Sequence, residues 1–227
     1  MSLVEVVLGP IIWVMTQVLE LAHRLTGGYG LAIIVLSFVV SLALTPLALI
    51  SRRAEQREKA LHDALKPGLD EARAKYRGEQ RFNAIEKVYK AHNYHPIMAL
   101  RSLSGLALQL PFLIAALLLL IDYPPLQGAR FLVIQDLGQP DRLLALGGLT
   151  VNLLPLAMVA ISLLDAWANP LMGREAAVRF AILAVGLFLL VYALPAAVVL
   201  YWTCNNLWAL GRTLLRRRTP STPIGAG

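Results

Sequence analysis

The stretch YGLAIIVLSFVVSLALTPL, residues 29–47, is almost entirely apolar, but three hydroxyl residues interrupt it. Ser37, Ser41 and Thr45 are four residues apart, so on a helix they lie on one face. About 20 consecutive apolar residues are needed to cross the hydrocarbon core of a bilayer. The stretch therefore predicts a membrane-spanning helix that carries an uncharged polar stripe along one side.

The composition of the whole chain is typical of an integral membrane protein. Of the 227 residues, 57% are hydrophobic and 15% are charged, and the mean hydropathy is +0.62. Soluble domains are about 45–50% apolar. The single cysteine, Cys204, excludes an intrachain disulfide. The net charge of +7 does not by itself indicate nucleic-acid binding, because membrane proteins concentrate Lys and Arg on their cytoplasmic side.

Hydropathy predicts an all-α integral membrane protein with five transmembrane helices. A charged block after the first span carries Leu61, Leu65, Leu69, Ala72 and Tyr76 at helical spacing, which predicts a helical hairpin in water. The predicted segments are an external, interfacial amphipathic helix (1–27), a first span (28–50), the cytoplasmic helical hairpin (51–100), a second span (101–121), an external loop (122–142), a third span (143–164), a cytoplasmic loop (165–175), a fourth span (176–193), a fifth span (194–214) and a basic cytoplasmic tail (215–227).

The distribution of basic residues predicts the orientation of the chain. All but three of the 21 Lys and Arg residues fall on the side of the hairpin and the C-terminus. Because the positive side is cytoplasmic, the N-terminus is predicted to lie outside and the C-terminus inside. This arrangement needs an odd number of spans. It favours an interfacial helix at residues 3–24 over the alternative, in which that segment is a sixth span.

Polar side chains recur within the predicted spans, mostly toward the cytoplasmic end. Two interpretations remain open: hydrogen bonds that join neighbouring helices, or the lining of a hydrated cavity that opens to the cytoplasm. The candidate groove-lining and client-contacting residues are Ser37, Ser41, Thr45, Arg101, Ser104, Gln109, Asn152, Ser162, Thr203, Asn205 and Asn206.

The sequence contains no catalytic motif, so we predict that the protein is not an enzyme. His92 and His95 have a spacing that is compatible with a metal, but no third ligand is obvious, and solvated surface histidines are the simpler interpretation. Neither a metal nor a cofactor is predicted.

Six motifs in order resemble the YidC/Oxa/Alb membrane protein insertase family. They are YGLAIIVLSFVVSLALTPL (29–47), LKPGLDEARAKY (65–76), VYKAHNYHP (88–96), LQLPFLIAALLLL (108–120), FLVIQDLGQPD (131–141) and LPAAVVLYWTCNNLW (194–208). The resemblance covers roughly residues 10–218 and agrees with the predicted topology.

The resemblance implies an insertase or chaperone in the bacterial cytoplasmic (inner) membrane. Such a protein transfers hydrophobic segments of newly made membrane proteins sideways into lipid, through a polar groove open to the cytoplasm, without a cofactor. Its implied partners are nascent membrane proteins, the ribosome or signal-recognition machinery, and membrane lipids. The residues that we expect to contact the ribosome or lipid are Arg52, Arg53, Arg57, Arg73, Lys75, Arg77, Arg216, Arg217 and Arg218.

The chain departs from the family pattern at the centre of the groove. Bacterial members usually carry an arginine there, and Ser41 stands at the matching position. Arg101 is the basic residue that lies nearest the mouth of a span. The departure keeps a second hypothesis open, in which this chain is a structural or assembly subunit with a stable partner in another membrane complex. A transporter is less favoured, because no inverted repeat is visible.

Overall fold

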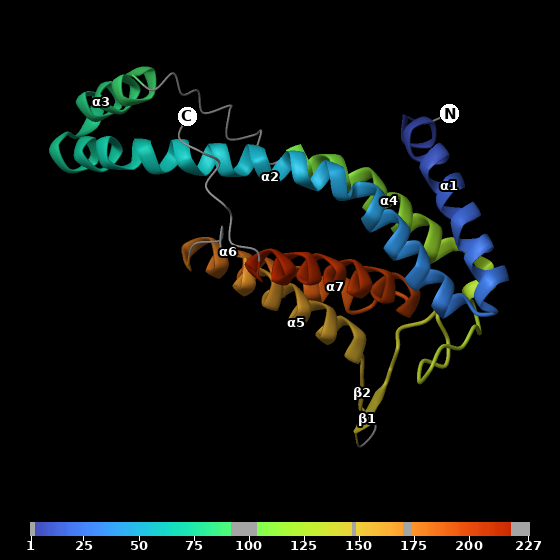
Figure 1. Ribbon diagram of the computed structural model, residues 1–227. Helices are drawn as coiled ribbons and strands as arrows, with labels where there is room; N and C mark the ends of the chain where they lie inside the picture. Colours follow the sequence, from blue (N-terminus) through green and yellow to red (C-terminus); the bar gives the residue numbers. More distant parts are fainter. Residues whose placement is uncertain (1–2, 92–103, 147–148, 170–173, 219–227) are drawn as a thin grey trace. The chain divides into compact units, whose positions relative to one another are not determined.

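The computed structural model describes residues 3–91, 104–146, 149–169 and 174–218, and these residues are helical apart from a short β-hairpin and loops (Figure 1). The predicted helical fold class is confirmed, and the strands are an addition to it. The elements are α1 (Leu3–Thr26), α2 (Tyr29–Lys75), α3 (Gly78–Ala91), α4 (Ser104–Asp122), the 3-10 helix η2 (Pro124–Leu126), β1 (Leu144–Leu146), β2 (Leu149–Val151), α5 (Leu153–Ala168), α6 (Arg174–Val191) and α7 (Ala196–Arg218).

The chain forms two compact units. The larger unit consists of residues 1–43 and 111–227, and the smaller unit consists of residues 44–110. Helix α2 belongs to both units, because the division between residues 43 and 44 falls within it. The helix also continues past residue 50, where the first span was predicted to end, and ends at Lys75. By length and hydropathy, Tyr29–Pro46 is the one segment of the described residues that is long and apolar enough to cross a bilayer. Gln109–Asp122, Leu153–Ala168 and Phe180–Val191 are shorter apolar helices.

Helix α1 buries a single apolar stripe in the larger unit. Leu8, Met15, Leu19 and Ala22 are buried at intervals of three, four and seven residues, which is the pattern of an amphipathic helix. The chain then turns at Gly27, whose φ of 74° is costly for other residues. The Gly27 amide donates to the His23 carbonyl at 2.8 Å and so closes the last turn of α1.

Helices α5, α6 and α7 share an apolar core. Met158 of α5, Val191 at the end of α6 and Val199 of α7 form its buried centre. The first six residues of α7, from Ala196 to Tyr201, are all buried. This tight packing fixes the position of α7, which carries the asparagine pair described below.

The loop between α4 and α5 uses its carboxylates to cap backbone groups. Asp136 Oδ1 accepts hydrogen bonds from the amides of Gly128 and Gly138, and Asp141 Oδ2 accepts from the amides of Leu153 and Leu154 at the start of α5. A carboxylate at this position satisfies amides that have no partner within the helix. The loop therefore sets where α5 begins.

The β-hairpin occupies residues that were expected to begin the third span. Strands β1 and β2 are antiparallel, with Leu144 opposite Val151. In the sequence, Gly147 and Gly148 separate the strands and lie outside the described residues. Consequently α5 begins at Leu153, ten residues after the predicted start of that span at 143.

In the smaller unit, the second half of α2 packs against α3. Leu65, Leu69 and Ala72, which belong to the predicted amphipathic stripe, are buried. A Cβ atom on Gly68 would lie 3.1 Å from Val88 Cγ1 of α3, so the two helices approach closely at this glycine. Gly78, with φ of 56°, begins α3 after the turn.

Candidate functional site: a polar cluster shared by three helices

The first two positions of the hydroxyl stripe of α2, Ser37 and Ser41, face α7. Ser37 is only 1% exposed, and Ser41 is half-buried. Both hydroxyls donate to the same acceptor, Asn205 Oδ1 of α7, at 2.9 Å from Ser37 Oγ and 2.7 Å from Ser41 Oγ. The Tyr201 carbonyl lies 3.3 Å from Ser37 Oγ and offers that hydroxyl an alternative acceptor. One amide therefore joins two turns of α2 to α7.

The neighbouring asparagine joins α7 to a different helix. Asn206 Nδ2 donates to Ser162 Oγ of α5 at 2.7 Å, and that hydroxyl donates to the Met158 carbonyl at 2.9 Å. Consecutive residues on a helix are about 100° apart around its axis, so Asn205 and Asn206 address two different neighbours. We call Ser37, Ser41, Ser162, Asn205 and Asn206 the polar cluster. It joins α2, α5 and α7 without a charged group of its own.

Two other predicted groove residues are engaged elsewhere in the larger unit. Thr203 Oγ1 donates to the Val199 carbonyl of its own helix at 2.7 Å. Asn152 lies at the start of α5, where its Nδ2 donates to the Tyr192 carbonyl at 2.7 Å and its Oδ1 accepts from the Arg142 amide at 3.0 Å. These bonds tie the loop, α5 and the end of α6 together.

The remaining predicted groove residues are not members of the polar cluster as defined above. Thr45 is half-buried in α2 and Gln109 is exposed in α4, both in the smaller unit. Ser104 is the first residue of α4. Arg101, like His92 and His95, lies outside the described residues, so its predicted position near the groove stays a prediction.

The basic residues predicted to contact the ribosome or lipid fall on two helices and the turn between α2 and α3. In α2, Arg73 forms an exposed ion pair with Asp70, with 3.7 Å between Arg73 Nη1 and Asp70 Oδ1. Lys75 lies over the Tyr76 ring, and Arg77 is exposed in the turn. The other members belong to α2 and to the last residues of α7: Arg52, Arg53, Arg57, Arg216, Arg217 and Arg218. Their partners stay a prediction.

A separate aromatic group joins α1 to the beginning of α2 and the end of α4. The rings of His23 and Tyr29 stack with centroids 3.8 Å apart, and Tyr123 meets the Tyr29 ring edge-on at 6.0 Å. Tyr123 Oη donates to Glu20 Oε1 at 3.3 Å. Burial, with smaller contributions from Tyr29 and Glu20, raises the pKa of Tyr123 to about 12.

Metal chemistry has no visible support in the part of the chain that the structure describes. There, His, Cys, Asp and Glu side chains do not gather in groups of three or more that could hold a metal ion. The polar cluster consists of hydroxyls and amides, which can exchange hydrogen bonds with a peptide but carry no acid, base or nucleophile of suitable reactivity.

A comparison with known families matches most of this chain. The sequence model of the family described as 60Kd inner membrane protein matches residues 21–222. The chain belongs to this family. The match includes α2, α5 and α7, so all three helices of the polar cluster lie inside the 60Kd inner membrane protein region. The resemblance predicted from the six motifs is thereby confirmed.

Individual relatives of the 60Kd inner membrane protein family carry the name membrane protein insertase YidC. The protein from Janthinobacterium sp. (strain Marseille) is 29% identical over 215 residues, which cover 91% of this chain and 36% of that protein. The protein from Clostridium tetani is 29% identical over 193 residues, which cover 84% and 82% of the two chains. The protein from Thiobacillus denitrificans is 30% identical over 208 residues, covering 89% and 34%. This chain thus spans about a third of the length of the first of these relatives.

Sequence reasoning missed several residues that organise this member of the 60Kd inner membrane protein family. Asp141 caps α5, and Tyr192 binds Asn152 through both its hydroxyl and its carbonyl. Gly30 is buried against Phe131, whose ring a Cβ atom on Gly30 would overlap. An Asp that lies about a dozen residues before an apolar run only weakly predicts a cap for the helix that follows. No feature of the sequence predicts the close contact between Gly30 and Phe131.

Proposed function

We propose that this chain is a membrane protein insertase or chaperone, which transfers hydrophobic segments of client proteins sideways into the lipid bilayer of the bacterial inner membrane. Its family membership and the names of its relatives, which are membrane protein insertases, support this proposal. The observation that carries it is the polar cluster, because Ser37 and Ser41 on α2 meet Asn205 on α7 within otherwise apolar helices. Polar residues in membrane helices are costly and tend to mark the path of a substrate.

The proposed topology has five membrane spans, with the N-terminus outside and the C-terminus in the cytoplasm. The spans begin near the starts of α2, α4, α5, α6 and α7, and α1 lies at the outer interface. The second half of α2 with α3 forms the cytoplasmic hairpin. Support comes from the basic residues, since the hairpin and the tail hold most of the 21 Lys and Arg residues. With this orientation the polar cluster forms part of a groove that opens to the cytoplasm.

The bonding pattern of the polar cluster suits a groove that opens reversibly. Interhelical hydrogen bonds in membrane proteins contribute about 0.6 kcal/mol on average. Opening the two bonds to Asn205 would therefore cost about 1.2 kcal/mol, which corresponds to roughly a sevenfold change in population. A polar client flank can offset this loss of free energy by forming hydrogen bonds to the same hydroxyls and the same amide. The groove is therefore closed at rest and opens when a client binds.

The driving force for insertion lies in the client. Transfer of its apolar segment out of water is worth about 25 cal/mol per Å² of apolar surface. The barrier is the polar flank, because a charged side chain at the centre of a bilayer costs at least about 2.5–3.5 kcal/mol. A neutral cluster lowers this barrier by hydrogen bonding rather than by charge attraction. We infer that this insertase favours clients with uncharged polar flanks.

Contacts with the ribosome, the signal-recognition machinery or anionic lipid are proposed for the basic residues of α2, the adjoining turn and the end of α7. Their positive charge suits phosphate groups of RNA or lipid.

The test is reconstitution in proteoliposomes with a single-span client that has a short tail. The wild-type chain is expected to insert a client whose flank carries Ser and Asn, and to insert the same client with Asp in the flank less well. Ser41→Arg, which places a guanidinium beside Asn205, is expected to raise insertion of the acidic client specifically. Ser41→Gln is the matched neutral control and should insert the acidic client no better than the wild-type chain does.

Two results would contradict the proposal. If the wild-type chain inserts neither client while a known insertase does so in the same vesicles, the insertase activity is absent. If the purified chain instead retains a stoichiometric membrane partner, a structural or assembly role replaces it. Loss of folding in Ser41→Arg, read by circular dichroism, would show that Ser41 packs where no larger side chain fits.

A further inference from the structure

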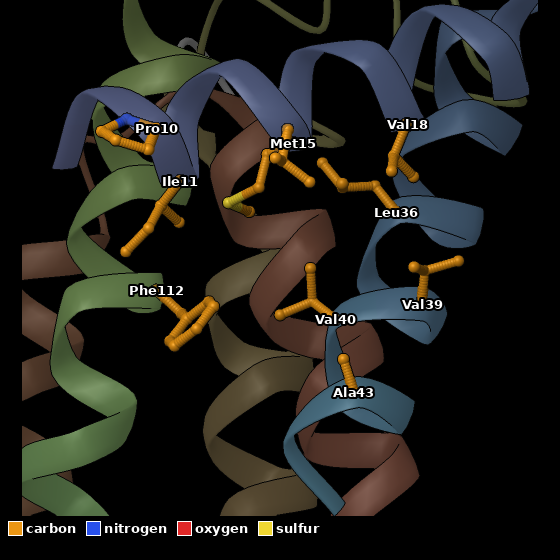
Figure 2. Close-up of a pocket in the computed structure, with 10 residues that line it drawn as sticks. Pro10, Ile11, Met15, Val18, Leu36, Val39, Val40, Ala43 and Phe112 are labelled. Atoms are coloured by element: carbon orange, nitrogen blue, oxygen red, sulfur yellow. The ribbon is translucent and has the colours of Figure 1, made fainter.

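An apolar cavity of about 300 Å³ lies between α1, α2 and α4 in the larger unit. Figure 2 shows Pro10, Ile11 and Met15 on the α1 side, Leu36, Val40 and Ala43 on the α2 side, and Phe112 of α4 at one end. Every residue that lines the cavity has a hydrocarbon or thioether side chain. This site is distinct from the polar cluster, whose residues are absent from the lining.

The chemistry of the lining excludes a polar occupant. An ordered water molecule needs two to four polar partners, and these side chains offer none. An extended peptide would bring backbone N–H and C=O groups, which cost free energy when they are left without partners in an apolar setting. An apolar cavity in a protein instead stays dry or takes up hydrocarbon, as engineered cavities of about 150 Å³ do with benzene.

The shape of the cavity suits a flexible chain better than the apolar helix of a client. A helix with side chains is about 10–12 Å across along its whole length, so a client helix needs a long groove of constant width. The cavity, of about 300 Å³, is instead a short space between side chains of three helices and is partly open at the surface. A flexible hydrocarbon chain has no fixed diameter of this kind and can fill an irregular space one methylene at a time.

The cavity is continuous with apolar surface that a lipid can reach. Val14 of α1 and Val39 of α2 both line it and are themselves exposed, 52% and 39% respectively. On the same stretch of α2, Val35 and Leu42 are exposed apolar residues. A hydrocarbon chain can therefore enter sideways from the membrane without passing a charged group.

We propose that this cavity binds one acyl chain of a membrane phospholipid. The inference rests on the proposed location in the membrane, but not on insertase activity. Unfilled apolar space is destabilising because the lining atoms lose their dispersion partners. An acyl chain restores these contacts and acts as a filler between α1 and the pair of α2 and α4. Lipid at this site thus holds α1 against the rest of the larger unit.

The experiment uses the purified full chain in nanodiscs that contain a phospholipid with a diazirine at the middle of one acyl chain. After irradiation, mass spectrometry maps the labelled residues. We expect labelling of Met15, Val40 and Phe112 to exceed labelling of Leu31, an exposed apolar residue outside the cavity, by about tenfold, a ratio that corresponds to ~1.4 kcal/mol. No client and no insertion reaction is needed, so the result is independent of the proposed function.

Two variants make the test specific. Ala43→Phe fills the cavity from its edge and is expected to reduce labelling of Met15 and Phe112 about tenfold. Leu42→Phe, at the adjacent exposed position, adds an aromatic ring outside the cavity and should leave that labelling unchanged. Ala43 is itself exposed, so the protein can accommodate the larger Phe side chain and still fold. Val40→Phe provides a second variant, which fills the cavity from a more buried position.

Three outcomes would overturn the proposal. The first is labelling of the cavity residues no stronger than labelling of Leu31. The second is labelling that survives both filling variants in folded protein. The third is saturable labelling of the same residues by a photoreactive client helix that displaces the lipid, which would assign the cavity to the client instead.

Discussion

The hydrogen bond between Ser41 and Asn205 predicts an energetic coupling between α2 and α7. The perturbation is a double-mutant cycle made of Ser41→Ala, Asn205→Ala and the combined variant. The two atoms are 2.7 Å apart, and both residues are half-buried. Interhelical hydrogen bonds in membrane proteins contribute about 0.6 kcal/mol on average and up to about 1.7 kcal/mol, so we expect a coupling energy of about 1 kcal/mol.

The single variants should differ in size. Asn205 Oδ1 also accepts from Ser37, so Asn205→Ala removes two bonds and should lower the free energy of unfolding about twice as much as Ser41→Ala. The serine hydroxyls can turn to carbonyls of their own helix, which limits the loss. The assay is reversible unfolding of the purified chain in bicelles, with each variant measured under the same lipid conditions.

A second cycle provides the control. Asn206 follows Asn205 directly but donates to Ser162 of α5, so Ser41→Ala and Asn206→Ala should be additive to within about 0.5 kcal/mol. The reasoning is refuted if the Ser41–Asn205 coupling is below about 0.3 kcal/mol or no larger than the Ser41–Asn206 coupling. Such a result would mean that the polar cluster does not hold α2 to α7.

Three further predictions concern the larger unit, all measured as changes in the free energy of unfolding. Asp141→Ala removes the acceptor for two amides at the start of α5 and should cost about 1 kcal/mol, whereas Asp141→Asn, which can still cap, should cost less. Gly30→Ala should cost about 1–3 kcal/mol because its Cβ overlaps the Phe131 ring, and Phe131→Ala in the same chain should recover part of the loss. Because the pKa of Tyr123 is raised to about 12, its contribution to stability is fully present below the ordinary pKa of 10.0 and is lost as pH rises through about 12. Tyr123→Phe should therefore flatten the pH dependence in that window, and an identical wild-type and variant profile would contradict the assignment.

Much of the helical architecture was predictable because hydrophobic patterns are local. The apolar run at 29–47 and the stripe at Leu65, Leu69 and Ala72 both identify helices that the structure contains. The boundaries were less predictable. No local signal ends α2 at residue 50, since Pro46 lies within the helix and the following charged residues are good helix formers. The start of α5 was placed too early because an apolar hairpin and an apolar helix look alike over a few residues.

The candidate site was predictable in its residue types but not in its pairings. Ser37, Ser41, Ser162, Asn205 and Asn206 were all expected to be functional because polar residues inside apolar helices are costly. Their grouping depends on distances between helices, which a single sequence does not encode locally. Asn152 illustrates the limit, because its position in an apolar segment gave no sign that it binds the Tyr192 carbonyl at the end of α6.

The sequence by itself determined the helical fold class, the family and the hydroxyl spacing on α2, because each follows from residue types at fixed intervals along one chain. Only the tertiary structure decided that Asn205 faces α2 while Asn206 faces α5, and that α1, α2 and α4 leave an apolar cavity between them. These features depend on how helices rotate and approach one another. That is settled by side-chain packing over the whole unit, where a small change in position makes or breaks a hydrogen bond or fills a void.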